Sequence, residues 1–320
     1  YVNASGETYI YIAIRRGPMK TPESGTEVFA IDTASTPSPE YTSNFPVDMG
    51  IIKDASGSDS FITQRLTKTL LRTNQTSAES AGTGIEFDYQ DGYGDNFYGA
   101  DASVYSWMFR RAPGFFDVVA YEGDGVSNRQ INHNLGVAPE LTIIKVRDQS
   151  SRQWFVRCSY LPNPNDEYFF LSLNNGLSSV SGTWLTPTET TFGLGIAFAE
   201  VNNAGWKYIS YHFATLPGVS KVGSYTGNGT SQTIDCGFSA GARFVMTKRT
   251  NTTGNWNVWD SGRGIVAGND PRLELNTTDA EDTGHDYIDP DSSGFVVNYV
   301  ADDDDDSNVS GDENIFIAIA

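Results

Sequence analysis

Apolar residues recur at every second position in several short stretches of the chain. Three of these stretches stand just before a proline: TYIYIAIRRGP before Pro18, VYSWMFRRAPG before Pro113 and YISYHFATLPG before Pro217. The last residues, NIFIAIA, repeat the pattern. A period of two places alternate side chains on one face of a strand, and proline cannot donate to a sheet ladder. Each stretch therefore predicts a strand with a buried face that ends before the proline.

These strands close a longer internal repeat. AYEGDGVSNRQINHNLGVAPELTIIK, residues 120–145, and SYTGNGTSQTIDCGFSAGARFVMTKR, residues 224–249, both read Tyr-x-Gly-x-Gly, a polar run, an isoleucine, a turn and an apolar run to Lys145 or Lys248. Trp154 and Trp256 follow, and LSLN at 171–174 aligns with LELN at 273–276. A shorter copy keeps the sequence IIK at 51–53 and Asn74, which aligns with the asparagines of the other two copies. Such self-similarity is typical of a tandem array.

The repeat divides the chain into modules of about 100 residues. Residues 1–19 correspond to the last strand of a preceding module, and 20–115, 116–219 and 220–320 form modules 1, 2 and 3. A folded unit does not begin with its own last strand, so we expect the chain to be a piece of a longer protein.

Strand-sized runs separated by turn clusters fill each module. In module 2 they are 118–121, 141–146, 153–158, 168–173, 191–198 and 208–213. This spacing, with 12% aromatic residues and 32 glycines, favours an all-β fold of tandem β-sandwich modules. The segment 60–72 comes closest to a helical period, but its threonines argue against a helix. We expect the sandwiches to follow one another in a rod or array.

Charge and cysteine usage exclude some classes of function. The chain has 40 acidic and 21 basic residues, a net charge of −19, which would repel nucleic acid. No run of 18 apolar residues predicts a membrane span. Cys158 and Cys236 stand at non-equivalent positions of two repeats, so we expect free, structural thiols.

No catalytic site is predicted. The three histidines, His133, His212 and His285, occupy no repeated position and have no nucleophile context. The glycines of Tyr-x-Gly-x-Gly precede a strand rather than a helix, so they indicate a turn and not a phosphate site. Paired carboxylates could hydrolyse glycosides, but no acidic pair recurs between modules. We predict no enzyme activity and no cofactor.

Two groups of residues are candidates for binding. Asp286, Asp289 and Asp291 offer oxygen ligands for structural calcium, as do the acidic stretches 88–101 and 302–306, although none has EF-hand spacing. The alternative is a solvated acidic loop. In the loop DYQDGYGDNFYGAD, aromatic rings could stack on sugar faces, or could instead pack locally or against a neighbouring subunit. These residues are Tyr89, Tyr93, Phe97 and Tyr98.

The sequence of module 2 resembles repeated modules of bacteriophage tail-fibre and other virion proteins, particularly those of marine phages. The resemblance rests on Tyr121-x-Gly-x-Gly, the run INHNLGVAP at 131–139, the apolar run to Lys145, and Trp154. Module 3 matches in part, since it has DCGFSAG where module 2 has NHNLGVA, and module 1 has almost lost the opening motif. The resemblance supplies no catalytic residues.

The resemblance implies a virion structural protein, a spacer or host-attachment module of a tail fibre. Partners would be other virion proteins, host-surface carbohydrate and further copies of the chain in a homo-oligomer such as a trimer. Two alternatives remain: a secreted or cell-surface bacterial adhesin and a polysaccharide depolymerase.

Overall fold

The computed structural model describes residues 19–320 apart from positions 37, 83, 96 and 302–306. Their regular secondary structure consists of antiparallel strands, apart from a short α-helix, α1 (Ala199–Asn202), and a 3-10 turn, η1 (Gly25–Glu27). The all-β prediction is confirmed. The segment from 60 to 72 forms two strands, as the threonines indicated. The strand predicted within residues 1–19 lies outside the described residues, which begin at Met19.

Each module has a large inner sheet with equivalent strand order. In module 1 it comprises, in order, β1 (Phe29–Thr33), β8 (Val104–Phe109), β3 (Met49–Asp54), β4 (Ser60–Gln64), β5 (Thr69–Arg72) and β6 (Ser80–Ala81). In module 2 it comprises β9 (Phe116–Glu122), β17 (Lys207–Phe213), β11 (Leu141–Val146), β12 (Trp154–Cys158), β13 (Glu167–Phe170) and β14 (Ser178–Ser179). In module 3 it comprises β18 (Ser220–Thr226), β25 (Glu313–Ile319), β20 (Phe244–Arg249), β21 (Asn257–Asp260) and β22 (Leu273–Glu274).

A smaller outer sheet covers one face of each inner sheet. The outer strands are β2 (Tyr41–Thr42) and β7 (Gly92–Tyr93) in module 1, β10 (Arg129–Asn132), β16 (Thr191–Leu194) and β15 (Trp184–Leu185) in module 2, and β19 (Gln232–Asp235), β24 (Gly294–Val297) and β23 (Ile288–Asp291) in module 3. Separate hydrophobic clusters fill the three sandwiches. The modules are therefore β-sandwiches, as predicted.

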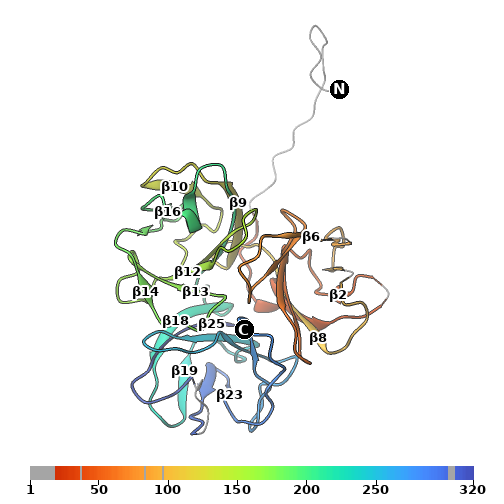
Figure 1. Cartoon of the computed structure of the whole chain (residues 1–320). Helices are drawn as coiled ribbons and strands as arrows, with labels where there is room; N and C mark the ends of the chain where they lie inside the picture. The colour runs from red at the N-terminus through yellow and green to blue at the C-terminus, as the bar shows by residue number, and fades with distance from the viewer. Residues whose placement is uncertain (1–18, 37, 83, 96, 302–306) are drawn as a thin grey trace.

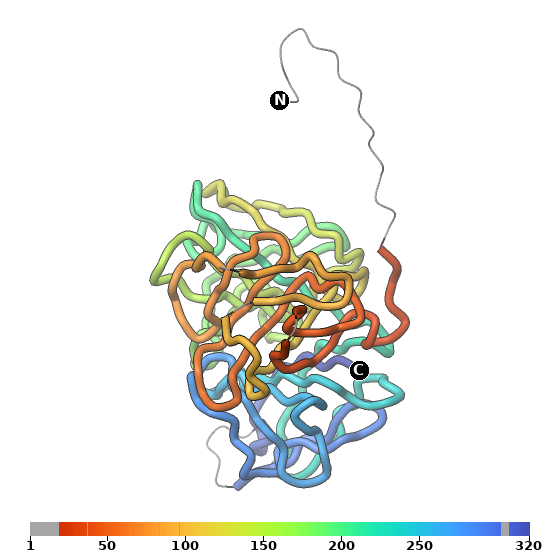
Figure 2. The backbone as a smooth tube through the Cα atoms, turned by 90° about the vertical axis from the view of Figure 1, so that its right-hand side faces the viewer, coloured from red at the N-terminus to blue at the C-terminus, as the bar shows by residue number. Residues whose placement is uncertain are grey.

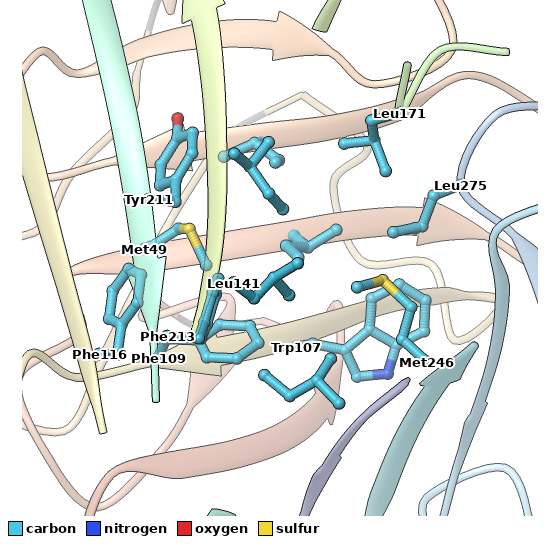
Figure 3. Packing of buried hydrophobic residues seen from close by; sticks show 14 of the residues in the cluster. Met49, Trp107, Phe109, Phe116, Leu141, Leu171, Tyr211, Phe213, Met246 and Leu275 are labelled. Carbon is cyan, nitrogen blue, oxygen red and sulfur yellow. The ribbon is translucent and has the colours of Figure 1, made fainter. Parts of the chain in front are cut away.

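The other face of each inner sheet packs into a single core shared by all three modules. Along β11, Ile143 points into this shared core and its neighbour Ile144 into the module 2 sandwich. Equivalent strands behave alike: Ile51 of β3 and Met246 of β20 meet Ile143 around one small apolar void. Figure 1 shows the three modules around this common centre, and Figure 3 shows the shared core from close by.

The three modules thus form a closed ring rather than a rod. The expectation of a rod assumed that each module contacts mainly the next one along the chain. Instead each inner sheet contributes residues to the same core, so every module contacts both others. Alternation along the strands predicts buried faces correctly, but it does not tell which partner covers each face.

The contacts between modules, which we call seams, repeat around the ring. Glu79 N–H donates to the Arg147 carbonyl at 2.7 Å, Leu177 N–H to Thr250 at 3.0 Å, and Glu281 N–H to Ala55 at 2.8 Å. The three acceptors stand two residues after Lys145, Lys248 and Lys53, at the end of equivalent strands. The seams are therefore related by an approximate threefold axis.

The repeated lysines and tryptophans serve these seams. Lys53 Nζ donates to the carbonyls of Ser58 in its own hairpin and Thr277 of module 3, both at 2.8 Å. Trp154 Nε1 donates to the Arg72 carbonyl of module 1 at 2.8 Å. Burial lowers the pKa of Lys53 to about 8. The buried amine at the end of each apolar run satisfies carbonyls, across a seam for Lys53 and Lys248 and within module 2 for Lys145.

The Tyr-x-Gly-x-Gly motif marks a close approach of two backbones. Gly123 packs against the Asn203 carbonyl in module 2, and Gly227 against the Val309 carbonyl in module 3, where a Cβ has no room. Each motif ends a strand and turns into the loop before the outer sheet, so the interpretation as a turn is confirmed.

One alignment inside the repeat is wrong by two residues. The amides of Leu171 and Leu275 both donate to the carbonyls of the repeated tryptophans, at 3.1 and 3.0 Å, so these two leucines are equivalent. Ser172, not Asn174, therefore occupies the position of Asn276. Each of LSLN and LELN has two leucines two positions apart, so leucine still aligns with leucine after a shift of two residues. Such a shift also leaves each side chain on the same face of the strand, so the pattern did not reveal the error.

The ring closes where the described residues begin and end. Gly25 packs directly against the carbonyl of Ala320, a place with no room for a Cβ. In Figure 2 the C-terminus lies beside the first coloured residues of module 1.

Candidate functional site

Tyr93, one of the four aromatic residues predicted to contact a sugar from the glycine-rich loop of module 1, is fully buried. Tyr93 lies in β7 with 0% of its surface exposed. Its ring stacks on Tyr41 at 5.0 Å and on Phe87 at 5.1 Å between centroids. Tyr93 therefore supports the module 1 sandwich and is not accessible to a ligand, because this part of the loop forms β7 and pairs with β2 in the outer sheet.

The other aromatic residues of this loop lie nearer the surface. Phe97 is 50% exposed and contacts both buried Phe61 and half-buried Tyr98, each at 4.9 Å between centroids. The Tyr89 hydroxyl donates to Glu86 at 3.1 Å. Tyr98 and Phe97 thus follow the alternative of local packing, although half of Phe97 remains exposed.

A buried carboxyl pair beneath this loop was not predicted. Glu40 accepts the amide N–H of Asp95 at 2.7 Å, and Asp95 is 1% exposed. Burial raises the pKa of Asp95 to about 6, and the neighbouring Glu40 carboxyl adds to the effect. The two residues are 55 positions apart, so no sequence motif connects them. Their enclosed position makes them supports of the loop rather than a hydrolytic pair.

The predicted calcium ligands separate into two environments in module 3. One amide nitrogen, Asn298 Nδ2, donates to Asp286 at 2.8 Å and to Asp289 at 2.9 Å. Asp291 instead accepts the N–H and hydroxyl of Ser293 in the β23–β24 turn. In the described part of the chain, no three acidic, histidine or cysteine side chains come together to hold a metal ion. The acidic residues 302–306 lie outside that part.

Asp286 and Asp289 line an open surface pocket of about 690 Å³. Its walls come from the β18–β19 loop, the β21–β22 loop, the start of β23 and the residues after β24. Ser231 donates to the side-chain carbonyl of Asn298 at 2.6 Å, which orients the amide toward the two carboxylates. Asn298 is buried, with 8% exposed, so this amide is a fixed floor for the pocket.

Two rings border the pocket. Tyr299 is 43% exposed, and the His285 side chain is 41% exposed. Nδ1 of His285 lies 3.1 Å from both an Asp282 carboxylate oxygen and the Tyr287 hydroxyl, which fixes the imidazole. The pocket therefore combines carboxylate, amide and hydroxyl groups with an exposed tyrosine.

Below the pocket lies another buried carboxyl group. Asp270 is fully buried and accepts the amide N–H of Val266 and of Ile288. Burial raises its pKa to about 6, and the negative charges of Asp286 and Asp289 act in the same direction. The field of the pocket thus reaches a group in the interior of module 3.

The other two histidines lie inside module 2. His212 is fully buried between Thr142 and Ser210, at 3.1 and 2.9 Å. Burial lowers its pKa well below the usual range, and the adjacent His133 acts in the same direction. Cys158 and Cys236 are free and buried, as predicted. These groups are structural.

Sequence reasoning found Asp286 and Asp289 but missed Ser231, Asn298 and Tyr299. Ser231 lies more than fifty positions from the aspartates, and nothing distinguishes it from other loop serines. Tyr299 had a weak signal, an aromatic residue two positions after the end of β24.

The sequence profile of one family, described as a domain of unknown function (DUF7483), matches residues 72–320. The chain belongs to this family. The DUF7483 match begins in β5 and includes modules 2 and 3 completely, so it covers the pocket. No curated protein and no solved structure matched the chain. Among the described residues, no helix has the length and apolar character needed to span a membrane.

Proposed function

We propose that the chain is a non-enzymatic structural subunit of a bacteriophage appendage, of tail-fibre type, that contacts host-surface carbohydrate through the module 3 pocket. Its location would be the virion, and its partners other virion proteins. The appendage part rests on the resemblance of the repeated modules. The carbohydrate part rests on one observation, the open polar pocket beside exposed Tyr299.

The chemistry of the pocket suits a sugar. A carbohydrate presents hydroxyl groups around its edge and C–H groups on its faces, so it is bound by hydrogen-bonding side chains together with an aromatic ring. Asp286, Asp289 and the Ser231 hydroxyl oxygen, whose proton is donated to Asn298, supply acceptors, and Tyr299 supplies a ring. Asn298 already has its partners and holds the carboxylates in place.

The ring arrangement of the modules argues against a role as a spacer. A rod of modules would gain length with each repeat, whereas three modules around one core gain none. The spacer role therefore has no geometric support, and the proposal is a compact attachment module. A homo-oligomer such as a trimer remains part of the proposal, and the mass of the protein in solution at micromolar concentration tests it.

The experiment that tests the function compares two tyrosines. Purified protein is titrated with surface polysaccharide of the host, and Tyr299→Ala is compared with Tyr160→Ala, a module 2 tyrosine that is 39% exposed and away from the pocket. We expect Tyr299→Ala to weaken binding about tenfold or more, in line with the loss of a stacking ring, and Tyr160→Ala to leave it unchanged. Equal binding by all three proteins would reject the pocket.

The alternatives predict other outcomes. Antibody labelling of intact phage particles separates an appendage from a secreted or cell-surface bacterial adhesin. New reducing ends after incubation with the polysaccharide would indicate a depolymerase. We expect none, because the buried pair of Glu40 and Asp95 has no access to a polymer.

A further inference from the structure

We infer that the module 3 pocket selects sugars with a protonated amine and rejects sugars with a carboxylate. This inference rests on the proposed carbohydrate function and adds the chemical class of the ligand. It follows from the pocket's shape, from its hydrogen bonds and from the charges of its walls.

The pocket presents two carboxylates with no lysine or arginine in its lining. Its one basic side chain is His285, whose Nδ1 lies 3.1 Å from Asp282 rather than beside Asp286 or Asp289. Arg272 of module 3 lies over the Tyr287 ring at 4.3 Å and near the carboxylates of Glu274 and Asp282, at 3.7 and 3.6 Å. Its charge is therefore already matched outside the pocket.

The hydrogen bonds hold the two carboxylates together without neutralising them. Asn298 contacts one oxygen of each, Asp286 Oδ1 and Asp289 Oδ2. An amide carries no net charge, so two negative charges remain beside each other. The second oxygen of each group can accept from a ligand, since Asn298 engages only one.

Such a site discriminates by charge. An ammonium group within a few ångströms of two carboxylates is attracted, and a sugar carboxylate in the same place is repelled by a comparable amount. A neutral sugar should bind with an affinity between these two, through hydroxyl contacts and Tyr299. Partial solvent access moderates the effect, so raising the salt concentration should reduce it.

The test uses three tetrasaccharides of defined charge: β-1,4-linked glucosamine, its fully N-acetylated counterpart, and galacturonate. Binding is measured by calorimetry near pH 6, where ordinary carboxylates are ionised and ammonium groups remain protonated. We expect the amine form to bind about tenfold more tightly than the acetylated form at low salt, and the galacturonate not to bind. The difference should shrink at high salt.

Charge-neutral variants separate the pocket from the acidic surface as a whole. The double variant Asp286→Asn with Asp289→Asn should remove the preference for the amine, although the net charge remains strongly negative. Asp291→Asn is the matched control, since it removes a charge from the same strand but outside the pocket. A preference that survives in the double variant, or falls equally in the control, would overturn the inference.

The outcomes also distinguish the inference from the proposed function. Binding of the host polysaccharide that depends on Tyr299, with equal affinity for amine and acetylated tetramers, overturns the charge selection alone. If neither the host polysaccharide nor any tetramer binds, the carbohydrate function fails and the inference fails with it.

Discussion

The three seams of the ring are equivalent in backbone and different in side chains. The middle residue of the strand before each proline or chain end is Trp107 in β8, Tyr211 in β17 and Ile317 in β25, which occupy the same position in their sheets. Trp107 Nε1 donates to Asp260 of module 3 at 2.8 Å, and Tyr211 donates to Gln64 of module 1 at 2.9 Å.

The third seam uses the same positions without a polar contact between them. Ile317 lies beside Cys158 of module 2 in an apolar setting. Gln64, Cys158 and Asp260 are themselves equivalent, since each is paired with the same position of the central strand. At this pair of positions, one fold thus gives two polar seams and one apolar seam.

This difference shows how a repeated module becomes specific for its neighbour. A buried hydrogen-bonding group costs free energy unless its partner is present. Trp107 requires Asp260, and Tyr211 requires Gln64, so exchanging two modules would leave these groups unmatched. The apolar seam makes no such demand. We therefore expect the two polar pairs to fix the order of modules, and the apolar pair of Ile317 and Cys158 to contribute through burial.

The largest effect should come from Asp260→Asn. Asp260 accepts from Trp107 and pairs with Arg263 at 2.7 Å, with 0% and 1% of the side chains exposed. The variant leaves a buried guanidinium with less compensation, although Glu281 remains 3.1 Å away. We expect a loss of about 3 kcal/mol in the free energy of unfolding, measured by denaturant titration. The exposed Asp235→Asn should change it by less than about 0.5 kcal/mol; similar values for the two would contradict the assignment.

Tyr211→Phe should have the next largest effect. It leaves the Gln64 carbonyl oxygen without its donor in the interior, at a cost of about 1–2 kcal/mol. Tyr160→Phe is the control, because its hydroxyl contacts Glu140 at the surface. If both variants unfold at the same denaturant concentration as the unmodified protein, the polar seam between modules 1 and 2 has no energetic role.

Ile317→Val tests the apolar seam. Removal of one buried methylene should cost about 1 kcal/mol, with no polar group left unpaired. The control Val266→Ala, at a residue 48% exposed, should lie within about 0.5 kcal/mol of the unmodified protein. A loss for Ile317→Val as large as that of Asp260→Asn would remove the distinction between seams.

Asp95→Asn should have the smallest effect on the free energy of unfolding at neutral pH. Asp95 lies inside module 1 rather than in a seam, so this variant compares a module interior with the seams. The folded-state pKa of Asp95 is raised to about 6, so the protonated form favours folding. Its contribution is complete below the unfolded pKa near 4 and is lost as pH rises through about 6. We expect the asparagine variant to unfold within about 1 kcal/mol of the unmodified protein at pH 7, and to show a flatter stability profile between about pH 4 and 7.

The measured quantity is the difference in free energy of unfolding between the Asp95→Asn variant and the unmodified protein at each pH. His212, whose pKa is lowered, contributes with the opposite sign, since its stabilisation is lost as pH falls below its unfolded value near 6.5. This contribution is common to both proteins and cancels. Identical profiles would show that Asp95 does not titrate in this range.

The sequence predicted the parts of the fold that depend on local pattern. Alternation located the strands that end in Phe109, Phe213 and Ile319, and the repeat placed the three lysines at equivalent positions. The strands LTIIKV and FVMTKR are buried on both faces, a pattern that indicates burial but does not identify the covering element. The ring therefore emerged only from contacts between distant residues.

The candidate site was predictable only in part, for a related reason. Asp286 and Asp289 could be found as an acidic group, but their arrangement in the pocket depends on Asn298 and Ser231, which the fold brings from other loops. Tyr93 looked like a surface residue because its neighbours are polar and glycine-rich. Its burial depends on Tyr41 and Phe87, which come from other parts of module 1.

Because Gly25 and Ala320 meet, the same ring of modules could be built by a chain that starts at any of the three. A short peptide linking these two points, with a new opening between Pro113 and Gly114 or between Pro217 and Gly218, would give a circular permutant whose modules keep the same neighbours. Connectivity would then start at a different sandwich while the shared core stayed intact. The architecture is held by what lies across each seam, and the covalent links between modules serve mainly to keep three partners at high local concentration.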